Sequence, residues 1–346
     1  MKKNSLGILY FFIHLIIEIT SFYIVTTYTN SNLVWVLALV YDFLAFVPQG
    51  LYGYLKDRGV NLNFTYLGLV LSTIALVLLY FNINPVIVIL VISTGNALIH
   101  VEGAEETLKS AKGKMTPAAL FVSGGSFGLI TGKLLSKYKV NVLYIIIINL
   151  LMIIPLFICR KFKNQIDSKN LEEYNYANKS INYKLIIFYS TLVVVIRAYM
   201  GYGIPTTWNK TVLQTIMLFC FMGVGKALGG ILIDHIGIRK TAFISTLGSL
   251  PFLIFGNNLM FVSLIGIMFF SMTMAITLGL IVSVLKKKPG VAFGFTTLGL
   301  FLGTLPIFFY KVDSVIVNSV IVTVLTLICV IILSVICRKE NKYERS

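Results

Sequence analysis

The sequence contains few charged residues for its length. Of its 346 residues, 12% are charged and 57% are hydrophobic. A soluble domain of this size needs more charge to cover its surface, so the composition favours an integral membrane protein. Acidic residues are the scarcer kind, with 13 against 29 basic residues and a net charge of +16. Because the basic residues fall mostly between apolar segments, we expect the lipid bilayer as the partner of this chain and no nucleic acid.

Several motifs of catalytic and metal-binding proteins are missing. The four cysteines form no C-x-x-C pair and no cluster with histidine, which argues against a metal site or a disulfide framework. No phosphate-binding glycine loop and no nucleophile elbow occur, so we expect neither an enzyme nor an ATP-driven pump, and no cofactor.

Long apolar segments make up most of the chain. A membrane helix needs about 20 mainly apolar residues. By this criterion we predict an all-α membrane protein with twelve transmembrane helices, at 6–28, 33–55, 62–82, 85–104, 117–135, 140–159, 184–204, 212–233, 241–256, 259–284, 289–310 and 315–337.

The loops between these segments alternate in basic charge. Lys and Arg concentrate at the two termini, in alternate loops and in the polar connection 160–183. By the positive-inside rule these parts are cytoplasmic, which places both termini inside the cell and the protein in the cell membrane. Five lysines are then assigned to the outer side: Lys133, Lys137, Lys139, Lys210 and Lys311. The three at residues 133–139 weaken the pattern.

The polar connection divides the predicted helices into two equal sets. We interpret 160–183 as a cytoplasmic linker between an N-terminal six-helix bundle, 1–159, and a C-terminal six-helix bundle, 184–346.

One loop motif occurs in both halves. "GYLKDRG" (Gly53–Gly59) and "GILIDHIG" (Gly230–Gly237) share Gly, Leu and Asp at the same spacing. The second copy continues to G-x-L-x-D-x-x-G-x-R-K, whereas the first lacks the later glycine and the basic pair. The motif residues are Gly53, Asp57 and Arg58 in the first copy, and Gly230, Asp234, Gly237, Arg239 and Lys240 in the second.

This motif, with twelve predicted helices and a central linker, resembles the loop signature of the major facilitator superfamily. The resemblance implies two six-helix bundles that rock around a central site, in a monomer. The aspartate can accept hydrogen bonds from the N-terminus of a neighbouring helix and pair with a nearby arginine, which would hold the two halves together on the cytoplasmic side. Alternatively, the acid and the bases only mark the end of a helix.

Ionisable side chains within the predicted helices are rare, and each is a functional candidate. His14 and Glu18 lie four residues apart on one face of the first helix. We take the following residues as candidates for proton coupling: His14, Glu18, Asp42, His100 and Glu102. The alternative is a static buried pair that holds helices together.

A second group of residues is a candidate for substrate contacts. Arg197 could serve as a counter-ion for Glu18 or Asp42, or bind an anionic substrate. Asn96, Tyr199 and Tyr202 are further candidates, although aromatic residues also occur at packing interfaces. Lys226 is expected to extend to the cytoplasmic interface.

The fifth predicted helix carries Gly124, Gly128 and Gly132 at four-residue spacing, which allows close helix packing. This row resembles the antiporter signature of the superfamily, but Lys133 stands where that signature has proline. Together with H-x-x-x-E in the first helix and "HVEG" in the fourth, it resembles the fosmidomycin-resistance branch, which implies proton-driven efflux.

We therefore predict a secondary active transporter that moves a small molecule by alternating access, with protons as the coupling ion. The alternative is a membrane sensor or assembly factor that has the shape of a transporter and moves nothing. Short outer loops and the incomplete first copy of the motif keep this alternative open.

Overall fold

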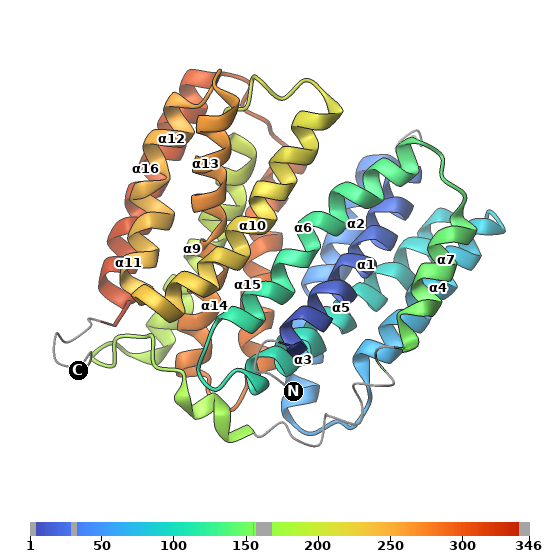
Figure 1. The fold of residues 1–346 in the computed structure, drawn as a ribbon, viewed down its shortest axis with the longest axis horizontal. Coiled ribbons are helices and arrows are strands. Elements are labelled where there is room, and N and C mark those ends of the chain that lie inside the picture. The colour runs from blue at the N-terminus through green and yellow to red at the C-terminus, as the bar shows by residue number, and fades with distance from the viewer. Residues whose placement is uncertain (1–4, 29–32, 155, 157–167, 339–346) are drawn as a thin grey trace.

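The structure is a computed structural model, and it describes residues 5–28, 33–154, 156 and 168–338. Two groups of helices stand side by side (Figure 1). The first contains α1 (Ser5–Thr27), α2 (Val34–Phe46), α3 (Gln49–Asp57), α4 (Phe64–Tyr80), α5 (Pro85–Ser110), α6 (Thr116–Lys137) and α7 (Val142–Leu151). The second contains α9 (Tyr183–Gly203), α10 (Val212–Ile236), α11 (Ile238–Phe243), α12 (Leu250–Phe255), α13 (Met260–Ser271), α14 (Thr273–Val284), α15 (Pro289–Thr304) and α16 (Val315–Ile336). The predicted all-helical, two-bundle membrane fold is confirmed.

The predicted membrane segments coincide with apolar helices or pairs of helices. In the described residues, ten helical segments are long and apolar enough to cross a membrane, and α4 and α7 are shorter apolar helices. The predicted segment 140–159 is described only in part, because residues 155 and 157–159 lie outside the described residues.

Some segments are broken within the membrane. α2 and α3 form one segment that is interrupted at Val47 and Pro48, because proline cannot donate a hydrogen bond within a helix. A π-helical turn, η3 (Ile244–Gly248), separates α11 from α12, and Met272 separates α13 from α14. Such breaks release backbone carbonyl groups that need other partners in the membrane.

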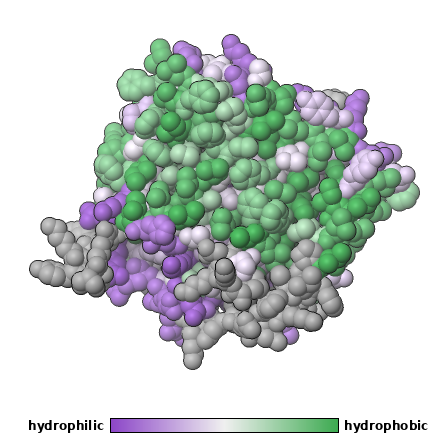
Figure 2. All heavy atoms as spheres, in the orientation of Figure 1, coloured by the Kyte–Doolittle hydropathy of each residue, from purple (hydrophilic) through white to green (hydrophobic). Residues whose placement is uncertain are grey.

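The outer surface suits a lipid environment. Figure 2 shows hydrophobic residues over the middle of the visible face and hydrophilic residues toward its two ends. Large apolar side chains are widely exposed, among them Ile316 at 77% and Phe255 at 75%. In water such an apolar surface would be an aggregation hazard, whereas hydrocarbon accommodates it.

The glycine row of α6 packs directly against α1. A Cβ atom added at Gly124, Gly128 or Gly132 would collide with the backbone carbonyl of Phe11, Leu15 or Ile19, respectively. Only glycine allows the two helices to lie this close. α1 therefore holds its polar side chains at a fixed distance from α5 and α6.

The linker is ordered where it is described. It contains a short 3-10 helix, η2 (Ser168–Glu173), and Ala177 then pairs with Cys337 at the end of α16. The hydroxyl of Tyr174 donates to the carbonyl oxygens of Leu108 and Lys114 in the first half. This segment therefore contacts both halves.

Candidate functional site

A buried cluster of polar side chains lies inside the first half. His14 and Glu18 come from α1, and Asn96 and His100 come from α5; all four are at most 7% exposed. The nearer Glu18 oxygen, Oε1, lies 3.8 Å from Nε2 of His14 and 3.6 Å from Nε2 of His100. Asn96 donates to the same oxygen at 2.8 Å. The structure thus brings four predicted site residues together around one carboxylate.

The hydrogen bonds fix the orientation of both imidazole rings. Nδ1 of His14 lies 2.7 Å from the carbonyl oxygen of Phe121, and Nδ1 of His100 lies 2.9 Å from that of Asn96. A carbonyl oxygen can only accept, so both Nδ1 atoms carry a hydrogen. In the neutral rings, both Nε2 atoms then present a lone pair toward Glu18.

Three acceptor atoms therefore point toward one another. Two neutral histidines and one carboxylate would repel each other at this spacing unless a cation is shared among them. The ligand atoms of His14, Glu18 and His100 all lie within 4.8 Å of one another, a spacing that accommodates a proton or a metal ion. The chemistry that this arrangement supports is reversible cation binding in a buried site.

Two further residues complete the cluster. The amide nitrogen of Asn96 also lies 3.0 Å from the Ser21 hydroxyl and 3.0 Å from the Tyr41 hydroxyl. Ser21 lies on α1, three residues beyond Glu18, so the helical period could have identified it. Tyr41 comes from α2, and only the packing of α2 against α5 brings it there.

The second half approaches the cluster through two side chains. The ring of Phe293 in α15 stacks on His100 with 6.4 Å between centroids. Lys226 in α10 is half-buried and lies close enough to Glu18 for their charges to interact. Lys226 was expected to extend to the cytoplasmic interface; among the described residues it forms no hydrogen bond or ion pair, and its charge interacts with Glu18 and His100. The cluster therefore lies beside the boundary between the halves.

Asp42 and Glu102 do not join this cluster. Asp42 is half-buried in α2 and makes no described hydrogen bond to the cluster, although its charge interacts with Glu18 and with Lys133 in α6. Glu102 accepts from the backbone N–H of Thr65 at 2.5 Å and pairs with Lys56 at 3.3 Å. It thereby ties α3 and the start of α4 to α5, which is a structural arrangement.

Arg197 lies in the second half without a described carboxylate within ion-pair distance. Its Nη2 atom donates to the carbonyl oxygens of Ser245 at 3.1 Å and Phe270 at 2.5 Å, and its guanidinium covers the Phe270 ring. Ser245 belongs to the π-helical turn, and Phe270 lies next to the break at Met272. The structure therefore does not support a role as counter-ion for Glu18 or Asp42. Arg197 instead binds backbone groups that the broken helices release.

The two predicted tyrosines lie nearby on the same helix. Tyr202 is 60% exposed, and Tyr199 is half-buried and makes no hydrogen bond to the described residues.

Both copies of the loop motif cap a helix of the opposite half. Asp57 accepts from the backbone N–H groups of Gly290 at 3.1 Å and Val291 at 2.9 Å, at the start of α15. We call this contact the first latch. Each carboxylate oxygen satisfies one N–H group that the helix leaves unpaired, and the helix dipole favours the negative charge.

The second latch is the contact between Asp234 and the start of α6. Asp234 accepts from the backbone N–H groups of Met115 at 2.8 Å and Thr116 at 2.9 Å, and from the Thr116 hydroxyl at 2.5 Å. The Tyr176 hydroxyl of the linker donates to the Gly113 carbonyl oxygen at 2.6 Å and, in a longer contact, to Asp234 at 3.3 Å. Burial and the nearby Asp234 carboxylate raise the pKa of Tyr176, so this hydroxyl remains a donor.

Glycines allow the backbones to meet at both latches. A Cβ atom at Gly53 would lie 2.8 Å from the backbone nitrogen of Val291, and one at Gly230 would lie 2.8 Å from the carbonyl oxygen of Met115. Gly237 ends α10 at φ +87°, a conformation that favours glycine.

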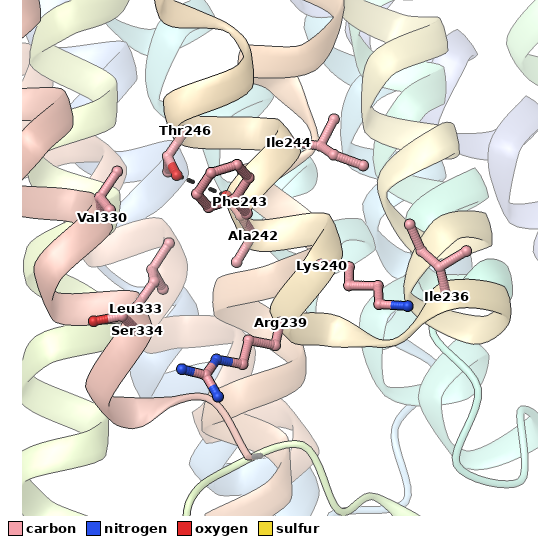
Figure 3. Close-up of a pocket in the computed structure, with 10 residues that line it drawn as sticks. All are labelled: Ile236, Arg239, Lys240, Ala242, Phe243, Ile244, Thr246, Val330, Leu333 and Ser334. Atoms are coloured by element: carbon pink, nitrogen blue, oxygen red, sulfur yellow. Dashed lines mark hydrogen bonds between the residues drawn. The ribbon is translucent and has the colours of Figure 1, made fainter. Parts of the chain in front are cut away.

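The arginines next to the two aspartates are not their partners. Neither Asp57 nor Asp234 forms an ion pair within the described residues, which differs from the pairing expected from the sequence. Arg58 instead stacks on Tyr54, at 4.8 Å from the ring centroid. Arg239 and Lys240 line a pocket of about 660 Å³ between α11, η3 and α16, whose walls include Phe243, Val330 and Leu333 (Figure 3).

At the opposite end of the molecule, the two halves diverge. Figure 1 shows α6 and α10 close together at the latch end and separating toward the other end. A cavity of about 940 Å³ lies there, lined by the ends of α1 and α6, residues 139–141, residues 209–211 and the start of α10. We call it the mouth cavity. The molecule is thus closed at the latch end and open at the mouth end.

Comparisons with known proteins agree with this architecture at the level of the fold. No protein-family model and no curated protein matches the sequence. Among solved structures, a double-tryptophan mutant of XylE is similar with a TM-score of 0.65 and 14% identity, over 98% of this chain and 97% of that one. The E. coli fucose:proton symporter FucP is similar with a TM-score of 0.62 and 14% identity, over 95% of this chain and 97% of that one. The human organic anion transporter MFSD10 (TETRAN) is similar with a TM-score of 0.65 and 12% identity, over 96% of this chain and 100% of that one. The chain therefore has the major facilitator fold over nearly its whole length.

Proposed function

We propose that this protein is a secondary active transporter that carries a small molecule across the cell membrane by alternating access. The observation that carries the proposal is the asymmetry between the two ends. Two latches close one end, while the mouth cavity opens between the same halves at the other. At the closed end the halves contact through the latch hydrogen bonds and through the packing of α6 against α10 and of α3 against α15. Alternating access would exchange these contacts for corresponding ones at the other end. That the fucose:proton symporter and the organic anion transporter share this fold supports the proposal.

The orientation and the division of the chain belong to this proposal. The latch end would be cytoplasmic, because the loops there carry most of the basic residues. The structure would then correspond to an outward-open state. Residues 1–159 and 184–346 would move as two bodies joined by the linker 160–183, in a monomer.

We further propose that protons drive transport through the cluster of His14, Glu18 and His100. The three facing acceptor atoms need a shared cation, and a proton is the smallest that fits without displacing Asn96 from Glu18. Proton binding or release would change the charge at the boundary between the halves, where Lys226 and Phe293 contribute from the second half. This change of charge would couple to the exchange of states.

The direction of transport rests on a resemblance. The glycine row of α6, H-x-x-x-E in α1 and "HVEG" in α5 resemble the fosmidomycin-resistance branch, which favours export by proton antiport. In the structure, these three patches pack against one another, since Gly124 and Gly128 face α1 and Gly125 faces His14.

The experiment that tests the transporter proposal is counterflow in liposomes with purified protein. A transporter exchanges labelled cargo across the membrane without any gradient, whereas a sensor or assembly factor of this shape does not. Binding of a ligand without exchange would support the second candidate function, for which the short outer loops are the specific observation.

A further inference from the structure

The charged residues that line the mouth cavity are all positive. Four lysines line it, Lys133, Lys137, Lys139 and Lys210, and no aspartate or glutamate does. Within the described residues, none of these four ammonium groups forms an ion pair; the described ion pairs all lie within the first half, at Glu18, Glu102 and Glu105. A concave surface with charges of one sign concentrates ions of the opposite sign.

These lysines are also the residues that topology leaves unexplained. Of the five lysines assigned to the outer side, only Lys311 does not line the mouth cavity. The positive-inside rule provides no reason to collect basic residues at one outer site. A ligand of opposite charge provides one.

Lys133 lies deepest along α6 and reaches both halves. Its ammonium group lies 5.6 Å from the ring centroid of Phe22 in α1 and 5.7 Å from that of Phe219 in α10. Its charge also interacts with Asp42, which does not line the cavity. Lys133 is therefore held between the halves by two aromatic faces while it remains exposed to the cavity.

Helix α1 contributes residues to both the mouth cavity and the buried cluster. Tyr23 of α1 lines the cavity, and Glu18 lies five residues before it, about 7.5 Å along the same helix. Lys226 of α10 supplies a further positive charge near Glu18.

We infer that the cargo is a small organic anion, which enters through the mouth cavity. This inference rests on the proposed transport function and names the substrate class. A carboxylate in the cavity gains charge-assisted hydrogen bonds from lysines that have no other acidic partner there. A cationic cargo would meet four like charges, and a neutral one would gain nothing from them.

The first test measures the charge of the cavity directly. In a chain with Cys159, Cys220, Cys329 and Cys337 replaced by alanine, Val212→Cys places a thiol at the cavity and Phe81→Cys places one in an exposed turn without charged neighbours. The probes are the anionic sulfonatoethyl and the cationic trimethylammonioethyl methanethiosulfonates.

We expect the ratio of anionic to cationic reaction rates to be about tenfold higher at Val212→Cys than at Phe81→Cys. It should fall with added salt and return to the Phe81→Cys value when Lys137, Lys139 and Lys210 are changed to glutamine. These three lysines are at the surface, so the triple variant should fold. Equal ratios at both thiols would overturn the inference.

The second test measures selectivity for anions. Each probe is a carboxylate paired with its neutral amide: benzoate with benzamide, phenylacetate with phenylacetamide, and succinate with succinamide. We expect carboxylates to raise the Tm of the purified protein and their amides not to. The rise should be lost in Lys133→Gln and kept in Lys311→Gln, which changes an outer lysine away from the cavity.

A rise shared by the amides, or no rise with any carboxylate, would overturn the inference. The outcomes also separate it from the proposed function. Carboxylate binding that depends on Lys133 without exchange in liposomes would keep the anion site and contradict transport. Exchange of neutral or cationic compounds alone would keep transport and contradict the anionic cargo.

Discussion

The two halves of this molecule share an architecture but hold their interior charges differently. The first half buries two histidines around Glu18, with Asn96 bound to the same carboxylate. The second half buries Arg197, which among the described residues donates to backbone carbonyl groups and covers the Phe270 ring. Helices and latches thus occur in both halves, whereas among the described residues a cluster of titratable side chains occurs only in the first half. This difference places the proposed coupling chemistry in the first half and leaves the second half to move against it.

The two latches are alike in geometry and differ in the number of their donors. Each aspartate caps a helix of the opposite half through two backbone N–H groups. Asp234 accepts in addition from the Thr116 and Tyr176 hydroxyls. The incomplete first copy of the motif therefore keeps the shared backbone contact and lacks the side-chain reinforcement.

The largest effect is expected at Glu18, the carboxylate at the centre of the cluster in the first half. Glu18→Gln mimics a permanently protonated carboxyl, so we expect transport driven by a pH gradient to be abolished. Substrate exchange should persist, since it needs no net proton movement. Both are measured in liposomes, and Glu172→Gln, an exposed acid of the linker, is the matched control. Gradient-driven transport at the normal rate in Glu18→Gln would contradict the proton-coupling proposal.

Asp234→Asn and Asp57→Asn test whether the two latches differ in strength. An amide keeps one acceptor oxygen and loses the charge, and a hydrogen bond to a charged group contributes about 1.5–3 kcal/mol. We expect both variants to fold and to open the latch end more often, with the larger effect at Asp234 because it has more donors.

Spin labels at Lys114 and Lys240, one on each half, report this opening as a shift of the distances between the two labels to larger values. Transport should fall in the same order, Asp234→Asn below Asp57→Asn. A larger effect at Asp57, or unchanged distances in both variants, would show that the helix caps do not control closure.

A smaller effect is expected for the pair Glu18 and Arg197. They share no hydrogen-bond partner, so the stability changes of Glu18→Gln and Arg197→Gln should add, with a coupling energy below about 0.5 kcal/mol. Melting temperatures of the two single variants and the double variant give this value. Recovery of stability in the double variant would instead indicate an ion pair that forms in another conformation.

The smallest effect is expected from metal removal. If the cation shared by His14, Glu18 and His100 is a proton, treatment with a chelator should leave gradient-driven transport and Tm unchanged. Loss of either on chelation, with recovery after addition of zinc, would identify the cluster as a metal site instead.

Much of the architecture could be predicted from the sequence because the membrane imposes simple rules. Every backbone polar group must be satisfied within the hydrocarbon, so long apolar runs become helices, and their number and limits follow from length and hydropathy. The row of Gly124, Gly128 and Gly132 likewise indicated close packing, since only small residues allow it. His14 and Glu18 share a helix face at four-residue spacing, so their proximity was also local information.

Other features depend on which helices become neighbours, and sequence spacing does not encode this. The sequence allowed Arg197 as a counter-ion for Glu18, but the breaks at η3 and Met272 provide carbonyl partners for Arg197 inside its own half. Glu102 lies two residues from His100, yet on a helix this turns it to another face and toward Lys56. Lys133 and Lys210 are 77 residues apart in sequence and line one cavity. Helical period and hydropathy thus determined the elements, whereas the packing of the two bundles alone decided which charges meet, because electrostatic interaction depends on distance in space.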